Sequence, residues 1–330
     1  MQHAFTRLGR TLVLACMATV LAACGGSGSD TKAPTTGTLS LKLTDSPIDN
    51  AAKVVVVFTG VELQRADGTR VMITLPAPRE IDLLPLQDGR TVSLLDGTAV
   101  EAGAYQWMRL LITAEQNLQS GSYIQMMDGN RYPLYIPSGS ETGLKLQHAF
   151  NVAQGAITRL VIDFDLRKSV HAPPGQAPNW FLRPTLRLMD ELKVGTVAGT
   201  INLTDLATAQ GTTLAACKPG LYLFNGLGAT PDDMDGITTD GNDPVIYRML
   251  PNDGVTTTVS YTVPFVEAAA YTLAATCNYD VDASAALSEY DPTALAATPP
   301  AANPPGFQTM KWSKKDVTVL ANQTATVTLP

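Results

Sequence analysis

Asp163, Asp165 and Arg167 occupy every second position of one short segment, and the residues between them are apolar. This alternation predicts a strand whose three charged side chains share one face, with the two carboxylates about 7 Å apart. Two carboxylates at such a spacing could do general acid and base chemistry in a hydrolase, or bind a cation. The same pattern is also that of an ordinary solvated sheet face, so both interpretations stay open.

A second acidic cluster follows in a segment rich in Asp and Gly. Its carboxylates belong to Asp232, Asp233, Asp235, Asp240 and Asp243. Calcium is bound by roughly six to eight oxygen ligands on a flexible loop, which this segment could supply. It does not fit an EF-hand, because aligning Gly236 with the turn glycine places Pro231 at the first ligand position. Calcium is therefore the one cofactor considered, with a solvated acidic loop as the alternative.

The chain contains too few histidines to support most histidine-based sites. Beyond the N-terminal segment the sequence contains only His148 and His171, too few for a multi-histidine metal site and sparse for a histidine-based triad. The run 139–143 superficially resembles a nucleophile elbow, but Ser140 follows the first glycine directly. We therefore expect a protein that is not an enzyme.

Aromatic side chains could instead stack on sugar rings. Trp180 lies in a proline-rich stretch, residues 169–181, which predicts an exposed loop and makes this tryptophan the better candidate for a binding face. Trp107 lies in an apolar strand and is expected in the core.

The first 24 residues combine Arg7 and Arg10 with an apolar run, residues 11–21, and end in Leu21-Ala22-Ala23-Cys24. This pattern resembles a bacterial lipoprotein signal peptide with its lipobox, which implies that Cys24 becomes the lipidated first residue of the mature protein. The apolar run of about 11 residues is too short to span a bilayer. The alternative is a plain secretory signal that leaves Cys24 as a free thiol.

The residue after the lipidation site is Gly25, where an Asp commonly retains a lipoprotein at the inner membrane. The resemblance therefore implies a lipid anchor in the outer membrane of a Gram-negative envelope, with either face open. Residues 25–34 are rich in Gly and Ser and predict a flexible tether. We assign residues 1–23 to the signal peptide and 24–36 to the lipidated cysteine and tether.

Composition limits the class of partner. The chain carries 30 acidic against 23 basic residues, a formal net charge of −7, and no basic stripe interleaved with aromatic residues. Polyphosphate binding needs such a stripe, so nucleic acid is not an expected partner. Removing residues 1–23 from 330 leaves 307, which is more than one core usually serves and predicts two domains.

Short β-rich runs bounded by Gly, Pro, Asn and Asp dominate the remaining sequence, and long helical periodicity is scarce. We therefore predict an all-β protein with two β-sandwich-like domains, residues 37–193 and 194–330. Two cysteines remain once Cys16 is cleaved off and Cys24 is lipidated. In an oxidising compartment they predict a disulfide between Cys217 and Cys277, with two buried thiols as the alternative.

Three motifs carry a family resemblance: residues 37–47, 137–146 and 161–169. Together they resemble a family of bacterial lipoprotein domains known only as a domain of unknown function, over about residues 37–190. This resemblance implies location and architecture but no activity. Residues 194–330 resemble transthyretin-like or carboxypeptidase-regulatory-like β-sandwiches, which implies that the disulfide joins the ends of two strands.

Three functional hypotheses follow, in order of preference. The first is a binding or adhesion module for carbohydrate or another envelope component, which predicts an exposed aromatic or acidic patch. The second is a structural or assembly partner of an envelope protein complex, which predicts an apolar patch or an open strand edge. The third is a hydrolase that uses Asp163 and Asp165, which predicts that both lie in a cleft.

Overall fold

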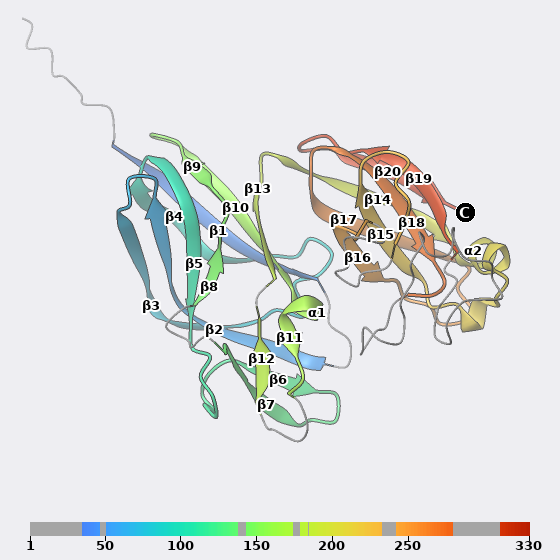
Figure 1. The fold of residues 1–330 in the computed structure, drawn as a ribbon, viewed down its shortest axis with the longest axis horizontal. Helices are drawn as coiled ribbons and strands as arrows, with labels where there is room; N and C mark the ends of the chain where they lie inside the picture. The colour runs from blue at the N-terminus through green and yellow to red at the C-terminus, as the bar shows by residue number, and fades with distance from the viewer. Residues whose placement is uncertain are drawn as a thin grey trace, which may run out of the picture. The chain divides into compact units, whose positions relative to one another are not determined.

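The computed structural model describes residues 35–46, 51–137, 143–173, 179–183, 185–232, 242–279 and 311–330. These residues form mostly β-strands in four sheets, so the all-β prediction is confirmed (Figure 1). The helices are short: α1 (Leu166–Ser169), α2 (Leu203–Gln210) and a 3-10 turn (Leu214–Ala216). In the part of the chain described, none of them has the length and apolar character needed to cross a bilayer.

Among the described residues, thirteen strands precede residue 194. They are β1 (Thr36–Ser46), β2 (Ala51–Arg65), β3 (Arg70–Asp82), β4 (Val92–Glu101), β5 (Gly103–Ile112), β6 (Tyr123–Met126), β7 (Arg131–Tyr135), β8 (Leu144–Leu146), β9 (Phe150–Val152), β10 (Ile157–Asp165), β11 (Val170–His171), β12 (Trp180–Leu182) and β13 (Leu186–Asp190).

These strands form two sheets. One has the order β13-β10-β1-β4, with β1 and β10 parallel. The other has nine strands in the order β11-β12-β7-β6-β2-β5-β8, with β3 beside β2 and β9 beside β5. Apolar side chains from both sheets make one continuous core, in which Leu41, Phe58 and Phe164 are fully buried. The sheets therefore stabilise each other mainly by removing apolar surface from water.

Halfway along the long strand β2, the residues that face the core change from even-numbered to odd-numbered positions. Val54, Val56 and Phe58 are buried in the core, and the next core residues are Val61 and Leu63. The alternation shifts by one residue at a register irregularity between Phe58 and Gly60, against both β3 and β5. An extra residue at such a β-bulge reverses the side-chain parity of the rest of the strand. Even-numbered residues after the bulge consequently leave the core.

Seven strands follow residue 193 in the described part of the chain. They are β14 (Val194–Asn202), β15 (Gly220–Asn225), β16 (Ile246–Met249), β17 (Thr258–Glu267), β18 (Ala270–Thr276), β19 (Ser313–Thr318) and β20 (Thr324–Leu329). They form one sheet in the order β17-β14-β20 and another in the order β16-β15-β18-β19, with a second apolar core.

The helix α2 connects these two sheets after β14 and is capped at both ends. The Asn202 side chain accepts hydrogen bonds from the backbone N–H groups of Thr204 and Asp205, and Gly211 ends the helix in a left-handed conformation at φ 76°. Both ends follow the usual capping preferences, which satisfy backbone groups that have no partner inside the helix.

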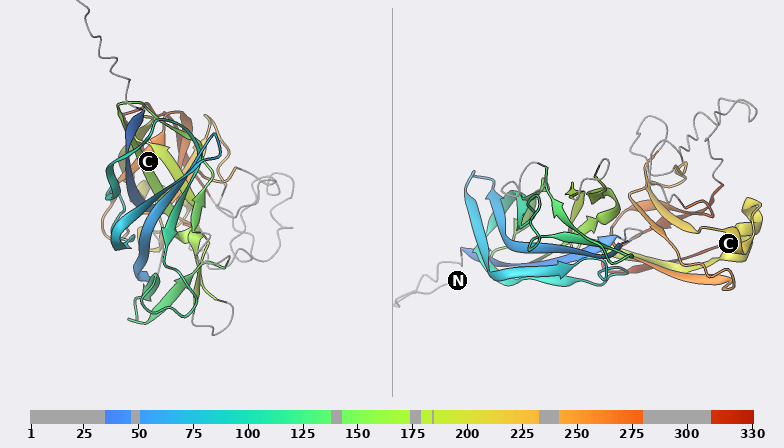
Figure 2. Two further views of the ribbon diagram at one scale, coloured as in Figure 1. Left: turned by 90° about the vertical axis from the view of Figure 1, so that its left-hand side faces the viewer. Right: turned by 90° about the horizontal axis from the view of Figure 1, so that it is seen from below.

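Strands β1–β13 and strands β14–β20 form separate groups, blue to green and yellow to red in Figure 2. Within the described residues, each strand pairs only with strands of its own group. The division into domains at residues 193 and 194, and the resemblance of the second part to transthyretin-like sandwiches, remain predictions.

The predicted disulfide between Cys217 and Cys277 is present in the structure. Cys217 lies just before β15 and Cys277 just after β18, and these two strands pair antiparallel from Gly220 with Thr276 onward. The bond therefore fastens one end of the central strand pair of its sheet, and both sulfur atoms are buried in the second core.

Replacing Cys217 and Cys277 together by Ser should lower the free energy of unfolding by about 4 kcal/mol, because the bond closes a 60-residue loop in the unfolded chain. Denaturant unfolding of the oxidised protein and of the double variant measures this difference. Reductant should reproduce the loss in the parent protein and have no effect on the variant. Equal stability of all these forms would contradict a stabilising role for the bond.

Candidate functional site

Asp163 is buried and paired, contrary to its expected place on a solvated sheet face. It lies on β10 opposite Arg187 of β13, and its Oδ2 accepts hydrogen bonds from Arg187 Nη2 at 2.6 Å and Nε at 3.2 Å. Only 9% of its side chain is exposed, against 36% of that of Arg187. A carboxylate in this position is stabilised by a fork-shaped cation, and Asp163 lines none of the cavities of about 690, 530 and 350 Å³ in this structure.

Asp165 is the last residue of β10 and caps α1. Its Oδ1 accepts hydrogen bonds from the backbone N–H of Lys168 at 3.1 Å and from the hydroxyl of Tyr247 at 3.3 Å. Burial raises the pKa of the Asp165 carboxyl, and the nearby Lys168 opposes this shift. Both of these partners bind the carboxylate in a structural role, so the two aspartates do not form a pair facing one ligand.

The prediction that Arg167 continues the strand face of the two aspartates is wrong. The backbone leaves the sheet after Asp165, and residues 166–169 form α1. The reason is local: the Asp165 side chain satisfies an N–H group of the first helical turn, which favours the turn over continued strand.

Trp180 does not lie in an exposed loop as predicted. It opens β12, which pairs parallel with β7 opposite Leu134. Its ring is partly buried, packs against the first core, and lies 6.3 Å from the ring of Tyr132 between centroids. The prolines of the preceding segment predict irregular structure there, but Trp180 follows them, and β7 lies beside it and supplies the strand pairing.

The predicted calcium ligands are described only in part. Asp232 is buried and Asp243 half-buried, whereas Asp233, Asp235 and Asp240 lie outside the described residues, as does the predicted lipidation site Cys24. Over the described ranges, no three His, Cys, Asp or Glu side chains come together in a way that could hold a metal ion. The calcium site stays a prediction.

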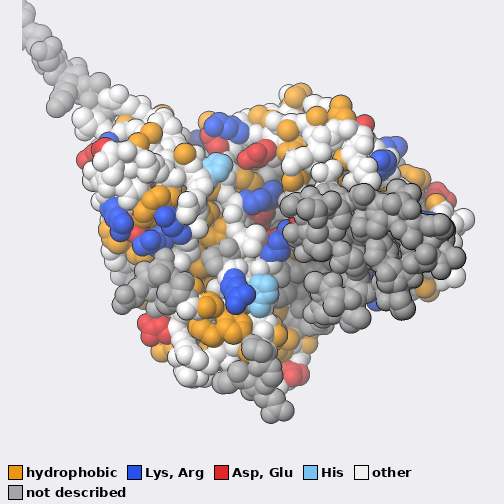
Figure 3. All heavy atoms as spheres, in the orientation of Figure 1, with side chains coloured by type: hydrophobic (Ala, Val, Ile, Leu, Met, Phe, Trp, Pro, Cys, Tyr) orange, Lys and Arg blue, Asp and Glu red, His pale blue; other side chains and the backbone are white. Residues whose placement is uncertain are grey.

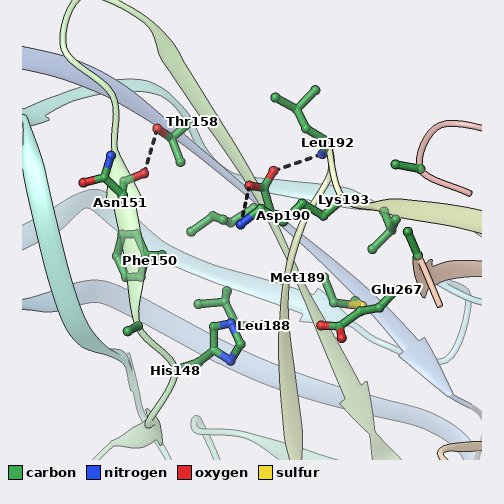
Figure 4. Close-up of a pocket in the computed structure, with 15 residues that line it drawn as sticks. His148, Phe150, Asn151, Thr158, Leu188, Met189, Asp190, Leu192, Lys193 and Glu267 are labelled. Carbon is green, nitrogen blue, oxygen red and sulfur yellow. Dashed lines mark hydrogen bonds and ion pairs between the residues drawn. The ribbon is translucent and has the colours of Figure 1, made fainter. Parts of the chain in front are cut away.

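A cavity with a volume of about 690 Å³ lies beside β10 and β13 (Figure 4). His148, Asp190, Lys193 and Glu267 line it together with apolar residues. Asp190 accepts a hydrogen bond from the backbone N–H of Leu192 at 2.9 Å and pairs with Lys193 at 3.7 Å. Two of the charges that line the cavity, Asp190 and Lys193, therefore neutralise each other. None of the predicted catalytic, metal-binding or binding-face residues lines this cavity.

A different feature gathers charge around an aromatic ring on the outer face of the nine-stranded sheet. Three cations lie over the ring of Trp107: Lys145 Nζ at 4.6 Å from the ring centroid, Arg109 Cζ at 5.1 Å and Arg70 Cζ at 5.6 Å. Beneath them is Glu62, with 7% of its side chain exposed. We call Glu62, Arg70, Trp107, Arg109 and Lys145 the Trp107 patch.

Glu62 connects two of the cations. Its Oε2 accepts a hydrogen bond from Arg109 Nη1 at 2.8 Å and its Oε1 one from Arg70 Nη1 at 3.3 Å. Arg70 Nε also donates to Gln64 Oε1 at 3.2 Å. These bonds hold both guanidinium groups beside the ring. In the space-filling view, Lys and Arg side chains gather around hydrophobic ones over the region of β5 and β8 (Figure 3).

Local irregularities of the strands place these side chains together. The bulge in β2 turns Glu62 outward, and a second register shift, between Gln64 and Arg65 against β5, separates the buried Tyr105 from the outward Trp107. Arg109 pairs with Glu62 on one side and with Lys145 of β8 on the other. Four strands therefore contribute to one surface.

Gly143 allows β8 to approach β5 closely at this surface. Its φ is +55°, and a Cβ at this position would lie 2.5 Å from the carbonyl oxygen of Leu110 and 2.9 Å from Cγ of Arg109. A residue with a side chain is strained in this conformation and has no room for its Cβ. The glycine thus fixes Lys145 next to Arg109.

The expectation that Trp107 belongs to the core misses this surface. The ring is partly exposed, while Met108 and Leu110 on the opposite face are buried. One sequence signal points to this outcome: Arg109 lies two residues after Trp107, so the two side chains share one face of a strand. The contribution of Glu62 carries no such signal, because it depends on the bulge.

A comparison with known protein families finds a match in the first part of the chain. Residues 36–184 match the model of a domain of unknown function, DUF4382. The match covers the region in which the motifs resemble a lipoprotein domain. No curated protein matches the sequence.

Similarity to solved structures is weak. A candidate cell adhesion protein from Bacteroides eggerthii is 12% identical, with coverage of 88% of this chain and 86% of that one and a TM-score of 0.19. One from Parabacteroides distasonis is 9% identical, with coverage of 73% and 78% and a TM-score of 0.20. A leucine-rich repeat protein from Bacteroides thetaiotaomicron is 13% identical, with a TM-score of 0.19. The match covers 89% of this chain but only 26% of that protein. Scores this low carry no functional argument.

Replacing Asp165 by Asn should leave the chain at least as stable at pH 7. Asn keeps an oxygen for the Lys168 N–H and the Tyr247 hydroxyl and removes a buried charge. Because burial raises the pKa of Asp165 above that of the unfolded chain, its contribution to stability falls as pH rises from about 4 through the folded pKa. The stability difference between parent and variant should therefore change with pH over this interval, as measured by denaturant unfolding.

The matched control is Asp163→Asn, which leaves Arg187 without its charged partner. This variant should lose about 1–3 kcal/mol at pH 7. Equal destabilisation by both substitutions at pH 7 would contradict the different roles given to the two carboxylates.

Proposed function

We propose that this chain is a non-catalytic binding or adhesion module of the cell envelope, and that the Trp107 patch contacts a carbohydrate or another envelope component. The observation that carries the proposal is a partly exposed indole ring with three cations within 6 Å of its centroid, two of which are held by a buried carboxylate. Aromatic and Arg side chains held in one conformation are typical of binding surfaces, because little entropy is lost when a ligand arrives.

The remaining candidate residues support catalysis less well. Asp163 is bound by Arg187, and Asp165 caps α1 and binds Tyr247, so neither is available as a general base in a cleft. A structural or assembly role is the second candidate, since β20 and β17 form the outer edges of their sheet in the described chain and an open edge can pair with another strand. Binding of envelope material that depends on Trp107 separates the two.

We propose further that Cys24 carries the lipid that holds this module at the outer membrane of a Gram-negative envelope. The lipobox and the following Gly/Ser segment support this proposal. Both lie outside the described residues.

Cys24→Ser should move the protein from the membrane pellet to the soluble fraction, because the acyl chains are the anchor that the substitution removes. Fractionation of cells expressing either form, with immunodetection, measures this. Retention of the variant in the membrane pellet would show that the lipobox assignment is wrong.

Trp107→Ala should weaken retention of residues 25–330 on insoluble envelope fragments of a Gram-negative bacterium by about tenfold, since a central aromatic anchor commonly contributes more than 1.4 kcal/mol. Sedimentation with increasing amounts of fragments measures the apparent dissociation constant.

The control is Leu227→Ala, which truncates another exposed apolar side chain, 60% exposed, beyond β15. It should bind like the parent. Equal binding by the Trp107 variant, with unchanged thermal unfolding, would refute the assignment of this surface.

A further inference from the structure

We infer that the ligand of the Trp107 patch is an acidic polysaccharide, whose anionic groups are held by Arg109 and Lys145 beside the indole ring. This inference rests on the proposed function, because it names the class of ligand for the same surface.

The patch has an excess of positive charge. Glu62 pairs with Arg70 and Arg109, and no other described carboxylate pairs with these two cations or with Lys145, so within the described residues the patch has two more positive than negative charges. In the other ion pairs of the described residues, each cation has a carboxylate of its own, as Arg187 has Asp163 and Lys42 has Glu191. A concentrated excess of one sign attracts ligands of the opposite sign.

The geometry keeps these like charges together before any ligand is present. Each cation near the ring face gains about 0.5–1 kcal/mol from the ring quadrupole, and Glu62 offsets part of the repulsion between the two guanidinium groups. Arg109 is fixed on two sides, by Glu62 and by the close approach of β8 at Gly143. The energetic cost of gathering the cations is therefore met during folding and not during binding.

Hydrogen-bond donors remain free in the patch. Nη1 of Arg109 donates to Glu62 and Nε is buried, so among the described residues Nη2 is the nitrogen of this guanidinium that remains free for a ligand. Lys145 is exposed and forms no ion pair within the part of the chain that the structure describes. A planar guanidinium and a neighbouring ammonium can each donate to a carboxylate or phosphate oxygen.

The surface is open, which favours a polymer over a small molecule. The residues of the patch lie on one face of a sheet, and none of them lines the cavities of about 690, 530 and 350 Å³ elsewhere in the chain. Small ligands usually need a concave site that covers most of their surface. A polymer with repeated anionic groups instead gains strength from repeated contacts on an open face.

The overall charge of the chain disfavours non-specific binding of a polyanion. With 30 acidic against 23 basic residues, the chain carries a formal net charge of −7. The inference therefore predicts binding that depends on a few named side chains and that weakens as salt screens them.

The test uses two polysaccharides with the same backbone. Polygalacturonate carries a carboxylate on every sugar, and its methyl ester carries none. Isothermal titration of residues 25–330 should detect binding of polygalacturonate, at least about tenfold weaker binding of the ester, and loss of affinity as NaCl rises from about 50 to 300 mM.

Two variants and one control assign the binding to the patch. Lys145→Gln should weaken polygalacturonate binding about fivefold, because it removes one positive charge, and Arg109→Gln about tenfold, because it also removes the cation that holds Glu62 in the patch. Lys53→Gln removes an exposed lysine from the same sheet, on β2 away from the ring, and should bind like the parent. Thermal unfolding of each variant checks that the fold is kept.

Each contrary outcome has a distinct meaning. Equal binding of polygalacturonate and its ester, or binding of neither while retention on envelope fragments still depends on Trp107, overturns the ligand class and leaves the proposed function standing. Binding to phosphatidylglycerol vesicles with the same dependence on Lys145, without binding to the polysaccharide, assigns the patch to a membrane surface and overturns the inference. If the parent protein neither binds polygalacturonate nor is retained on envelope fragments, both the inference and the proposed function are overturned.

Discussion

The direction in which the side chains of strand β2 point is the constraint on which the two sheets of strands β1–β13 depend. This strand borders β3 and β5 along one part of its length and β6 along another, and its apolar residues must face the core in both parts. A regular strand of this sequence would bury Glu62 and expose Val61. The bulge between Phe58 and Gly60 removes this conflict, because one extra residue reverses the side-chain direction. The same shift brings Glu62 to the outer face.

Burial of charge in this protein follows two patterns. Asp163 and Arg187 meet directly across two strands, so the carboxylate is compensated by one cation. Glu62 is compensated by two, and the second cation, with Lys145, makes the site positive instead of neutral. A buried carboxylate can thus close a network or organise an excess of charge around itself. The number of cations within reach decides between these outcomes.

Several features follow from the sequence alone. Short alternating and apolar runs bounded by turn residues predict an all-β chain, which the structure confirms, because strand periodicity is a local property. The number of cysteines and the predicted export signal predict the bond between Cys217 and Cys277, which the structure contains. The lipobox at Cys24 is likewise predicted from local sequence, and it stays a prediction.

Other features were decided by tertiary structure. Asp165 ends its strand because its side chain caps a turn, and Trp180 joins a strand because β7 lies beside it. The Trp107 patch combines residues from β2, β3, β5 and β8, up to 83 positions apart between Glu62 and Lys145. Periodicity says which residues share a face of one strand, but not which strands are neighbours or where a bulge reverses that face. The sequence therefore determined the class of fold and the bond between its cysteines, whereas only strand pairing decided where positive charge gathers.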